Sequence, residues 1–188
     1  MRFVVTAGPT REAIDPVRFL SNRSSGKMGY AIAEAAVAAG HNVKLISGPA
    51  SIAPPAGAEF ISITTSDELH DAVHRAVREC DVLVMCAAVS DYKPATVAPR
   101  KIKKQKTPFA LELIPTRDIL GSLSEEKRNY LVVGFAAETH DLESNAQKKL
   151  REKNCDAIVA NDVSQPDSGM ETDDNAVTIF CRNGETKS

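Results

Sequence analysis

The sequence has no apolar run near the roughly 18 residues that cross a bilayer, and the segment Met1–Thr6 is too short for a signal peptide. The formal net charge of −2 gives no basic excess, which argues against a general nucleic-acid binder. The four cysteines form no CxxC pair and have no histidine at metal-ligand spacing, so no zinc site is expected. Cys80, Cys86 and Cys155 lie in or beside apolar segments, which is typical of buried, reduced thiols in a cytoplasmic protein.

The sequence does contain a regular alternation of strand and helix patterns. With 43% hydrophobic residues, 188 residues suit one α/β domain with a sizeable core. Helical spacing predicts helices at about 27–39, from an N-cap at Ser66 to Cys80, and at about 142–153. Short β-branched runs, typical of strands covered on both faces, lie at 3–5, 43–46, 60–63, 82–85, 131–133 and 157–159. This order predicts a Rossmann-like, doubly wound, mostly parallel sheet.

Two regions interrupt the alternation. Residues 89–109 lack convincing periodicity, and a loop of that length is usually functional, so we expect a long flap after the fourth strand. Residues 177–181 predict a strand and Asn183-Gly184 a hairpin turn, but the chain stops at Ser188 before a return strand is complete. We therefore expect one domain, residues 1–188, with a C-terminal β-hairpin and a truncated C-terminus.

The fold class also predicts where a ligand binds. In a doubly wound sheet, the first strand and the strand after the third often flank the switch point, and those strands end here at 6–10 and 86–91. The standard cofactor motifs are absent. No GxGxxG directly follows the first strand, no acidic residue ends the second, and Gly26-Lys27 lacks the first glycine and the Ser/Thr of a P-loop.

The segment 21–29 is a candidate anion site. Ser24 and Ser25 can cap the following helix, while Gly26 and Gly29 allow the backbone to approach a phosphate closely. A plain N-cap with close helix–sheet packing explains the same residues equally well.

Basic residues form a second candidate. The run 100–106 has five cations in seven residues, which suits a polyphosphate but also a solvated face. Lys149 and Lys153, four apart on one helix face, either add to this cluster or are ordinary surface residues. The polar residues with least structural reason for their positions are Asn22, Asp91, Lys101 and Glu138. Either acid among them can instead cap a following helix.

Seven segments occur in order between about Phe3 and Phe180: 8–12, 15–18, 21–29, 87–92, 101–104, 134–139 and 160–163. Together they resemble phosphopantothenoylcysteine synthetase of the bacterial, CTP-using type. The resemblance implies a ligase of coenzyme A biosynthesis that joins 4′-phosphopantothenate and L-cysteine. The carboxylate attacks the α-phosphate of CTP to give an acyl-cytidylate and pyrophosphate, and the cysteine amine then displaces CMP.

The resemblance also implies cofactors and partners. Mg²⁺ accompanies CTP, with its protein ligands undetermined, and no flavin is expected in this chain. The family is a homodimer in which the segment after Asp91 reaches towards the partner and covers the site. In many bacteria the domain is fused to a flavin-dependent phosphopantothenoylcysteine decarboxylase. Neither nucleic acid nor membrane is implied as a partner.

Residue roles follow from matching positions. Asn22 matches the asparagine beside the acyl-cytidylate, and Lys101 is a candidate to stabilise charge in the amide-forming step. The turn 116–119 departs at its first two residues from the usual Asn-Pro-Asp-Ile. Positions matched to nucleotide contacts are Ala87, Asp91, Lys101, Thr116, Arg117, Asp118, Ile119, Phe135, Lys149 and Lys153. Those matched to phosphate or substrate contacts are Gly8, Arg18, Ser24, Ser25 and Gly26.

Other functions are compatible with the same fold. A short-chain NAD(P) oxidoreductase needs Tyr-x-x-x-Lys, but Tyr30, Tyr92 and Tyr130 are followed four positions later by Glu34, Thr96 and Gly134. A nucleotide-sensing module would use the same phosphate-binding segment without turnover, so turnover with cysteine separates it from the ligase. A flavoprotein would be coloured after purification.

Overall fold

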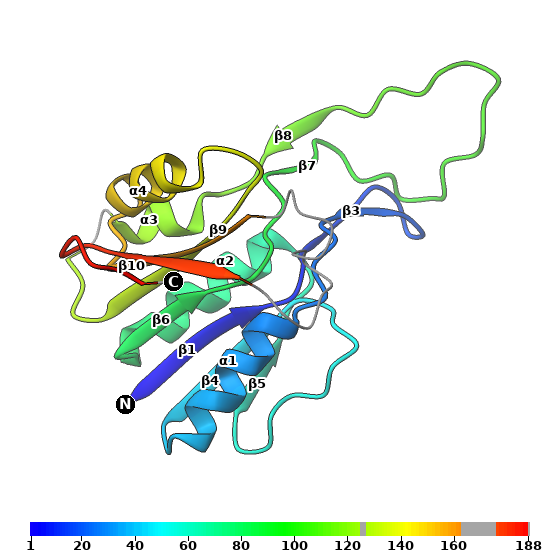
Figure 1. Ribbon diagram of the computed structural model, residues 1–188. Helices are drawn as coiled ribbons and strands as arrows, with labels where there is room; N and C mark the ends of the chain where they lie inside the picture. Colours follow the sequence, from blue (N-terminus) through cyan, green and yellow to red (C-terminus); the bar gives the residue numbers. More distant parts are fainter. Residues whose placement is uncertain (125–126, 163–175, 188) are drawn as a thin grey trace.

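The computed structural model describes residues 1–124, 127–162 and 176–187, and its centre is one eight-stranded sheet (Figure 1). The strand order is β12-β11-β10-β9-β6-β1-β4-β5. Six strands are parallel: β1 (Arg2–Ala7), β4 (Asn42–Ser47), β5 (Glu59–Ser62), β6 (Val82–Met85), β9 (Leu131–Glu138) and β10 (Ala157–Asp162). Two antiparallel strands, β11 (Val177–Cys181) and β12 (Thr186–Lys187), complete it. The predicted mostly parallel sheet and C-terminal hairpin are confirmed.

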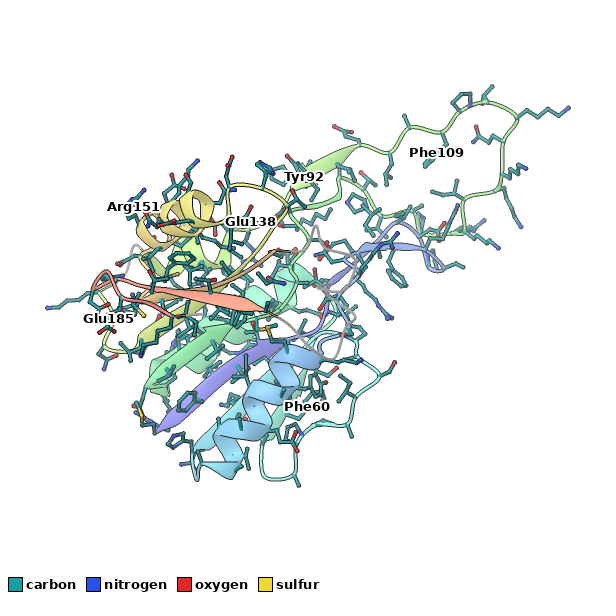
Figure 2. All side chains as sticks on the ribbon, viewed as in Figure 1. Phe60, Tyr92, Phe109, Glu138, Arg151 and Glu185 are labelled. Carbon is teal, nitrogen blue, oxygen red and sulfur yellow. The ribbon has the colours of Figure 1, made fainter. Side chains whose placement is uncertain are left out.

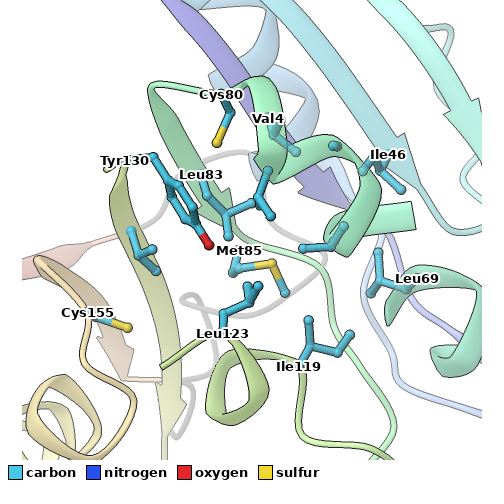
Figure 3. Close-up of a cluster of buried hydrophobic side chains, with 14 of the residues drawn as sticks. Val4, Ile46, Leu69, Cys80, Leu83, Met85, Ile119, Leu123, Tyr130 and Cys155 are labelled. Atoms are coloured by element: carbon cyan, nitrogen blue, oxygen red, sulfur yellow. The ribbon is translucent and has the colours of Figure 1, made fainter. Parts of the chain in front are cut away.

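Helices cover both faces of this sheet. Helix α1 (Lys27–Ala38) packs on β1 and β4, and Val5 and Leu45 point towards it. The opposite face carries α2 (Ser66–Ala76), a 3₁₀ turn (Val77–Glu79), α3 (Ile119–Ser124) and α4 (Leu142–Glu152). Figure 3 shows the apolar cluster on that side, where Leu83 and Met85 of β6 meet Leu123 of α3. Alternate residues of each strand enter opposite cores, which explains the continuous apolar runs in the sequence.

The amino end of α2 differs from the prediction. The N-cap is Thr65, not Ser66, because Thr65 is extended and its Oγ1 accepts the Glu68 N–H at 3.2 Å. The Glu68 carboxylate in turn accepts the Thr65 N–H at 3.2 Å, which completes a capping box. The predicted helices at 27–39 and 142–153 agree with α1 and α4 to within one residue at each end. No helix in the described part of the chain is long and apolar enough to cross a membrane.

The irregular stretch after β6 is a projecting flap. Strands β7 (Tyr92–Pro94) and β8 (Leu113–Pro115) pair as a short stalk, and residues 95–112 between them, called the flap here, extend away from the sheet (Figure 1). A second hairpin, β2 (Arg11–Ala13) with β3 (Phe19–Ser21), approaches it through an Ala98 N–H donated to the Ile14 carbonyl at 2.9 Å. Strands of three residues are too short to produce a period-two pattern, so the sequence did not predict them.

Candidate active site

The carboxyl ends of β1, β4 and β6 meet at one edge of the sheet. Beyond β6, the Ala88 N–H donates to the Gly8 carbonyl at 2.9 Å, and the Ala88 carbonyl accepts the Thr10 N–H at 3.1 Å. Gly8 has φ +69°, and a Cβ there would lie 2.9 Å from the Gly48 carbonyl oxygen. Only glycine fits this junction, because the backbone after β4 presses directly against it.

Helix α1 begins directly over this junction. Its N-cap is Gly26, at φ +83°, where a Cβ would lie 3.2 Å from the Gly8 Cα. Gly29, one turn in, packs on the end of β1, so that a Cβ there would lie 2.6 Å from the Ala7 Cβ. These close approaches place the amino end of the helix at the predicted ligand edge.

The serines do not cap α1 as expected. The N-cap position is occupied by glycine, and Ser24 Oγ accepts the Gly26 N–H at 3.2 Å while Ser25 Oγ accepts the Lys27 N–H at 3.4 Å. Within the described residues, the N–H groups of Met28 and Gly29 have no acceptor. Two free N–H groups at a helix amino end favour an anion.

A cavity of about 880 Å³ opens at this helix end. It brings Ser24 and Gly26, from the predicted phosphate segment, together with Ala87 and Phe135, from the predicted nucleotide set. Its other walls include Ile52, Ala53, Pro54, Cys86, Ala137 and Asn161. Burial raises the pKa of the Cys86 thiol to about 12, so this wall carries a neutral thiol at physiological pH.

Asn22 lies at the same edge of the sheet. It follows β3 directly, and its Nδ2 donates to the Ala88 carbonyl at 3.1 Å. In the described part of the chain nothing donates to its Oδ1. The protein therefore holds the Asn22 side chain through Nδ2, while Oδ1 is left to accept a hydrogen bond from a ligand.

A cationic group adjoins Phe135. Lys149 Nζ donates to the Phe135 carbonyl at 2.6 Å, and burial lowers the pKa of Lys149. Four residues later, at the C-cap of α4, Lys153 forms an ion pair with Asp118. Asp118 also accepts the Gly121 N–H at 2.8 Å and so caps the start of α3. The structure thus brings together four residues that belong to the predicted nucleotide set.

Three further residues of the predicted nucleotide set, Thr116, Arg117 and Ile119, are engaged elsewhere. The Ile119 side chain is buried in the core. Arg117 Nε donates to Asp67 at 2.9 Å, and Thr116 Oγ1 donates to the Ser90 carbonyl at 2.6 Å. These contacts hold the base of the stalk. Any approach of Ile119 to a nucleotide must therefore use its backbone.

Neither predicted acid caps a following helix. Asp91 precedes β7, and its carbonyl accepts the Thr116 N–H at 2.9 Å. Glu138 accepts from Asn145 Nδ2 at 3.0 Å, while the N-cap of α4 is Asp141.

Arg18 and Lys101 lie outside the cavity. Arg18 is paired with Asp15, whereas Lys101 is exposed on the flap. The role of Asp67, which binds both Lys93 and Arg117, was not predicted. An acidic first turn of α2 was visible in the sequence, but nothing there linked it to the stalk. The predicted motif 160–163 ends on Val163, which lies outside the described residues.

Comparison with known proteins gives the same assignment as the resemblance in the sequence. The family described as DNA/pantothenate metabolism flavoprotein C-terminal domain matches residues 1–188. The Coenzyme A biosynthesis bifunctional protein CoaBC of Bacillus subtilis is 52% identical over 98% of this chain, and that of Escherichia coli is 46% identical over 98%. The chain spans about half the length of these relatives, 46% and 47% respectively.

A solved structure supports the fold as well as the sequence match. The crystal structure of the C-terminal domain of a CoaBC protein superposes with a TM-score of 0.83 at 44% identity, covering 99% of this chain and 84% of that one. The chain therefore belongs to the family of the DNA/pantothenate metabolism flavoprotein C-terminal domain.

Proposed function

We propose that this chain catalyses the CTP-dependent ligation of 4′-phosphopantothenate and L-cysteine. The observation that carries the proposal is that one cavity brings the amino end of α1 together with Ala87 and Phe135. Family membership adds the metabolic context, since the relatives are named coenzyme A biosynthesis proteins.

The first step activates a carboxylate. A carboxylate oxygen of phosphopantothenate forms a bond to the α-phosphorus of CTP, and the bond from that phosphorus to the pyrophosphate oxygen breaks. The free N–H groups of Met28 and Gly29 suit phosphate oxygens, and the ammonium groups of Lys149 and Lys153 oppose the charge of the nucleotide. The product is an acyl-cytidylate, a mixed anhydride with a good leaving group.

Magnesium fits this site as an ion bound mainly by substrate phosphates. Across residues 1–124, 127–162 and 176–187, no three His, Cys, Asp or Glu side chains form a metal cluster. Mg²⁺ commonly uses one or two carboxylates with phosphate oxygens and water. Asp91 and Glu138, whose charges both act on Lys149, are the candidate carboxylates. When bound, the ion neutralises charge on the triphosphate.

The second step forms the amide. The cysteine nitrogen forms a bond to the acyl carbon, the bond from that carbon to the CMP oxygen breaks, and the nitrogen loses a proton. Asn22 is fixed at the Ala88 carbonyl, and we assign its free end to orient the acyl group. Lys101, carried by the flap, stabilises the negative charge that develops as CMP leaves.

We also propose a homodimer in which the flap reaches towards the partner and covers the site. Seven of the ten exposed large apolar side chains among the described residues lie on the flap, its stalk or the β2–β3 hairpin: Val17, Phe19, Tyr92, Val97, Phe109, Leu113 and Ile114. Figure 2 shows Tyr92 on the stalk and Phe109 out on the flap, away from the sheet. An apolar projection of this kind favours a protein partner.

The wider setting of the enzyme is part of the proposal. Its four cysteines are free thiols, which suits a reducing cytoplasm. Its proposed partner is a phosphopantothenoylcysteine decarboxylase domain, fused or separate, which consumes the ligation product.

Pyrophosphate release with 4′-phosphopantothenate tests this function, with CTP compared to ATP before and after cysteine is added. Release with CTP that becomes sustained on adding cysteine is the expected result. A preference for ATP would support the ligase activity but contradict the assignment of CTP as the nucleotide. Nucleotide binding without release, in a chain that includes the flanking sequence, would instead indicate a binding module.

A further inference from the structure

The loop between β2 and β3 contains a buried carboxylate, that of Asp15, whose side chain has 0% exposure. It accepts the backbone N–H groups of Val17 and Arg18, each at 2.9 Å, and Arg18 Nε at 3.1 Å. The hydrogen bond from the Arg18 guanidinium holds the pKa of this carboxyl well below its usual range. Asp15 is therefore a permanent anion, fully hydrogen-bonded within the protein.

One further donor to Asp15 comes from the flap. The Ile102 N–H donates to Asp15 Oδ2 at 3.1 Å, and the Ile102 carbonyl accepts from Arg18 Nη2 at 2.9 Å. Both backbone polar groups of Ile102 are thus held by the hairpin. Because a peptide group is planar, the bond to the Ile102 N–H also fixes the plane that contains the Lys101 Cα.

Beyond this point the flap is much less constrained. Residues 103–111 make no hydrogen bond or ion pair with any other residue in the described part of the chain. Lys101 therefore lies beside the last anchored residue on this limb of the flap. The Cα of Lys101 is therefore held in place, while the lysine side chain stays exposed.

The same hairpin leads directly to Asn22. The β2–β3 ladder pairs Arg11 with Ser21, the residue before Asn22. The hairpin is itself anchored to the body, because the buried Glu12 carboxylate accepts the Ser66 N–H of α2 at 2.8 Å. One short, anchored hairpin therefore connects the two residues assigned to the amide-forming step.

We propose that Asp15 is a positioning residue for Lys101, acting through the Ile102 peptide to hold the lysine over the acyl-cytidylate that Asn22 borders. The inference rests on the proposed function, since it uses the role assigned to Lys101 there. The simpler alternative is that Asp15 only stabilises its own loop, as an aspartate that accepts two local N–H groups often does.

A double-mutant cycle separates these alternatives. Asp15→Asn, Lys101→Gln and the double variant are compared for kcat and KM with CTP, phosphopantothenate and cysteine. Each single change is expected to lower kcat/KM by about 10- to 100-fold, because small displacements of a reacting group have effects of that size. The double variant is expected to stay within about twofold of Lys101→Gln, since Asp15 has nothing left to position.

Matched variants complete the experiment. Asp81→Asn removes a comparable contact to Arg2, remote from the flap, and is expected to retain wild-type kinetics. Ile102→Pro deletes the donated N–H while leaving the Asp15 loop intact, so its expected loss matches that of Asp15→Asn even if the latter folds poorly. The positioning role would be overturned if the loss of kcat/KM in the double variant equals the product of the two single losses. It would also be overturned if Asp15→Asn leaves the kinetics unchanged. Neither result would contradict the proposed function. A wild-type chain that includes the flanking sequence and is inactive with all three substrates would overturn the proposed function as well.

Discussion

Lys149 and Phe135 are joined by a hydrogen bond of 2.6 Å, from the lysine ammonium to the phenylalanine carbonyl. The bond ties helix α4 to strand β9 at the ligand edge of the sheet. Because burial is the main cause that lowers the pKa of Lys149, its positive charge is held in a partly desolvated place. A charge in such surroundings acts more strongly on a nearby phosphate than one in bulk water.

This relationship predicts an alkaline limit on the use of CTP. A lysine with a lowered pKa loses its proton, and so its charge, at a lower pH than an ordinary lysine. The kcat/KM for CTP is therefore expected to fall as pH rises, below the usual lysine range, because this ratio reports groups of the free enzyme. Lys149→Arg should reduce this fall in kcat/KM on the alkaline limb of the pH profile, since arginine stays charged. An unchanged alkaline limb in the arginine variant would remove Lys149 from nucleotide binding.

Asn22→Asp is expected to spare the first half-reaction and slow the second. The aspartate cannot donate to the Ala88 carbonyl as Asn22 Nδ2 does, and its charge opposes the acyl-cytidylate. Pyrophosphate release in a single turnover should remain within about threefold of wild type, while amide formation falls by about 100-fold, the scale of losing an oriented polar group. Rapid-quench measurement of both products checks this, and equal loss in the two steps would contradict the assigned role.

Gly29→Ala is expected to destabilise the protein by about 1–3 kcal/mol, the usual range for overpacking. The added Cβ would lie 2.6 Å from the Ala7 Cβ, so α1 must move away from the ligand edge. Chemical denaturation measures the free energy of unfolding, with Ala35→Ser, at an exposed position of the same helix, as the control. The same variant should weaken nucleotide binding because the amino end of α1 is displaced.

The purified chain is expected to be colourless. The family description contains the word flavoprotein, but the resemblance in the sequence implies a flavin only in a decarboxylase domain, so residues 1–188 are expected to bind none. An absorbance spectrum above 400 nm, taken before and after adding flavin mononucleotide and desalting, tests this. Retained yellow colour at a stoichiometric level would show that this domain also binds the cofactor.

Local patterns were sufficient for much of the fold. The apolar runs at Phe3–Val5 and Val82–Met85 predicted buried parallel strands, because a strand covered on both faces has no polar alternation. The asparagine-glycine pair at 183–184 predicted the C-terminal hairpin, where Gly184 has φ +88°. The short pairs β2–β3 and β7–β8 were missed, since three-residue strands depend on their partners rather than on their own periodicity.

The sequence by itself determined the order of the parallel strands and the three longer helices, the ligand edge and the motifs that placed the chain in its family, because these depend on residues close together along the chain. Only the tertiary structure decided which residues meet. Asp15 accepts a hydrogen bond from Ile102, 87 positions away, and Arg117 donates to Asp67. The Ile119 side chain is buried in the core, and the N-cap of α1 is Gly26. Hydrogen bonds between distant segments are fixed by packing, and their partners cannot be read from local composition.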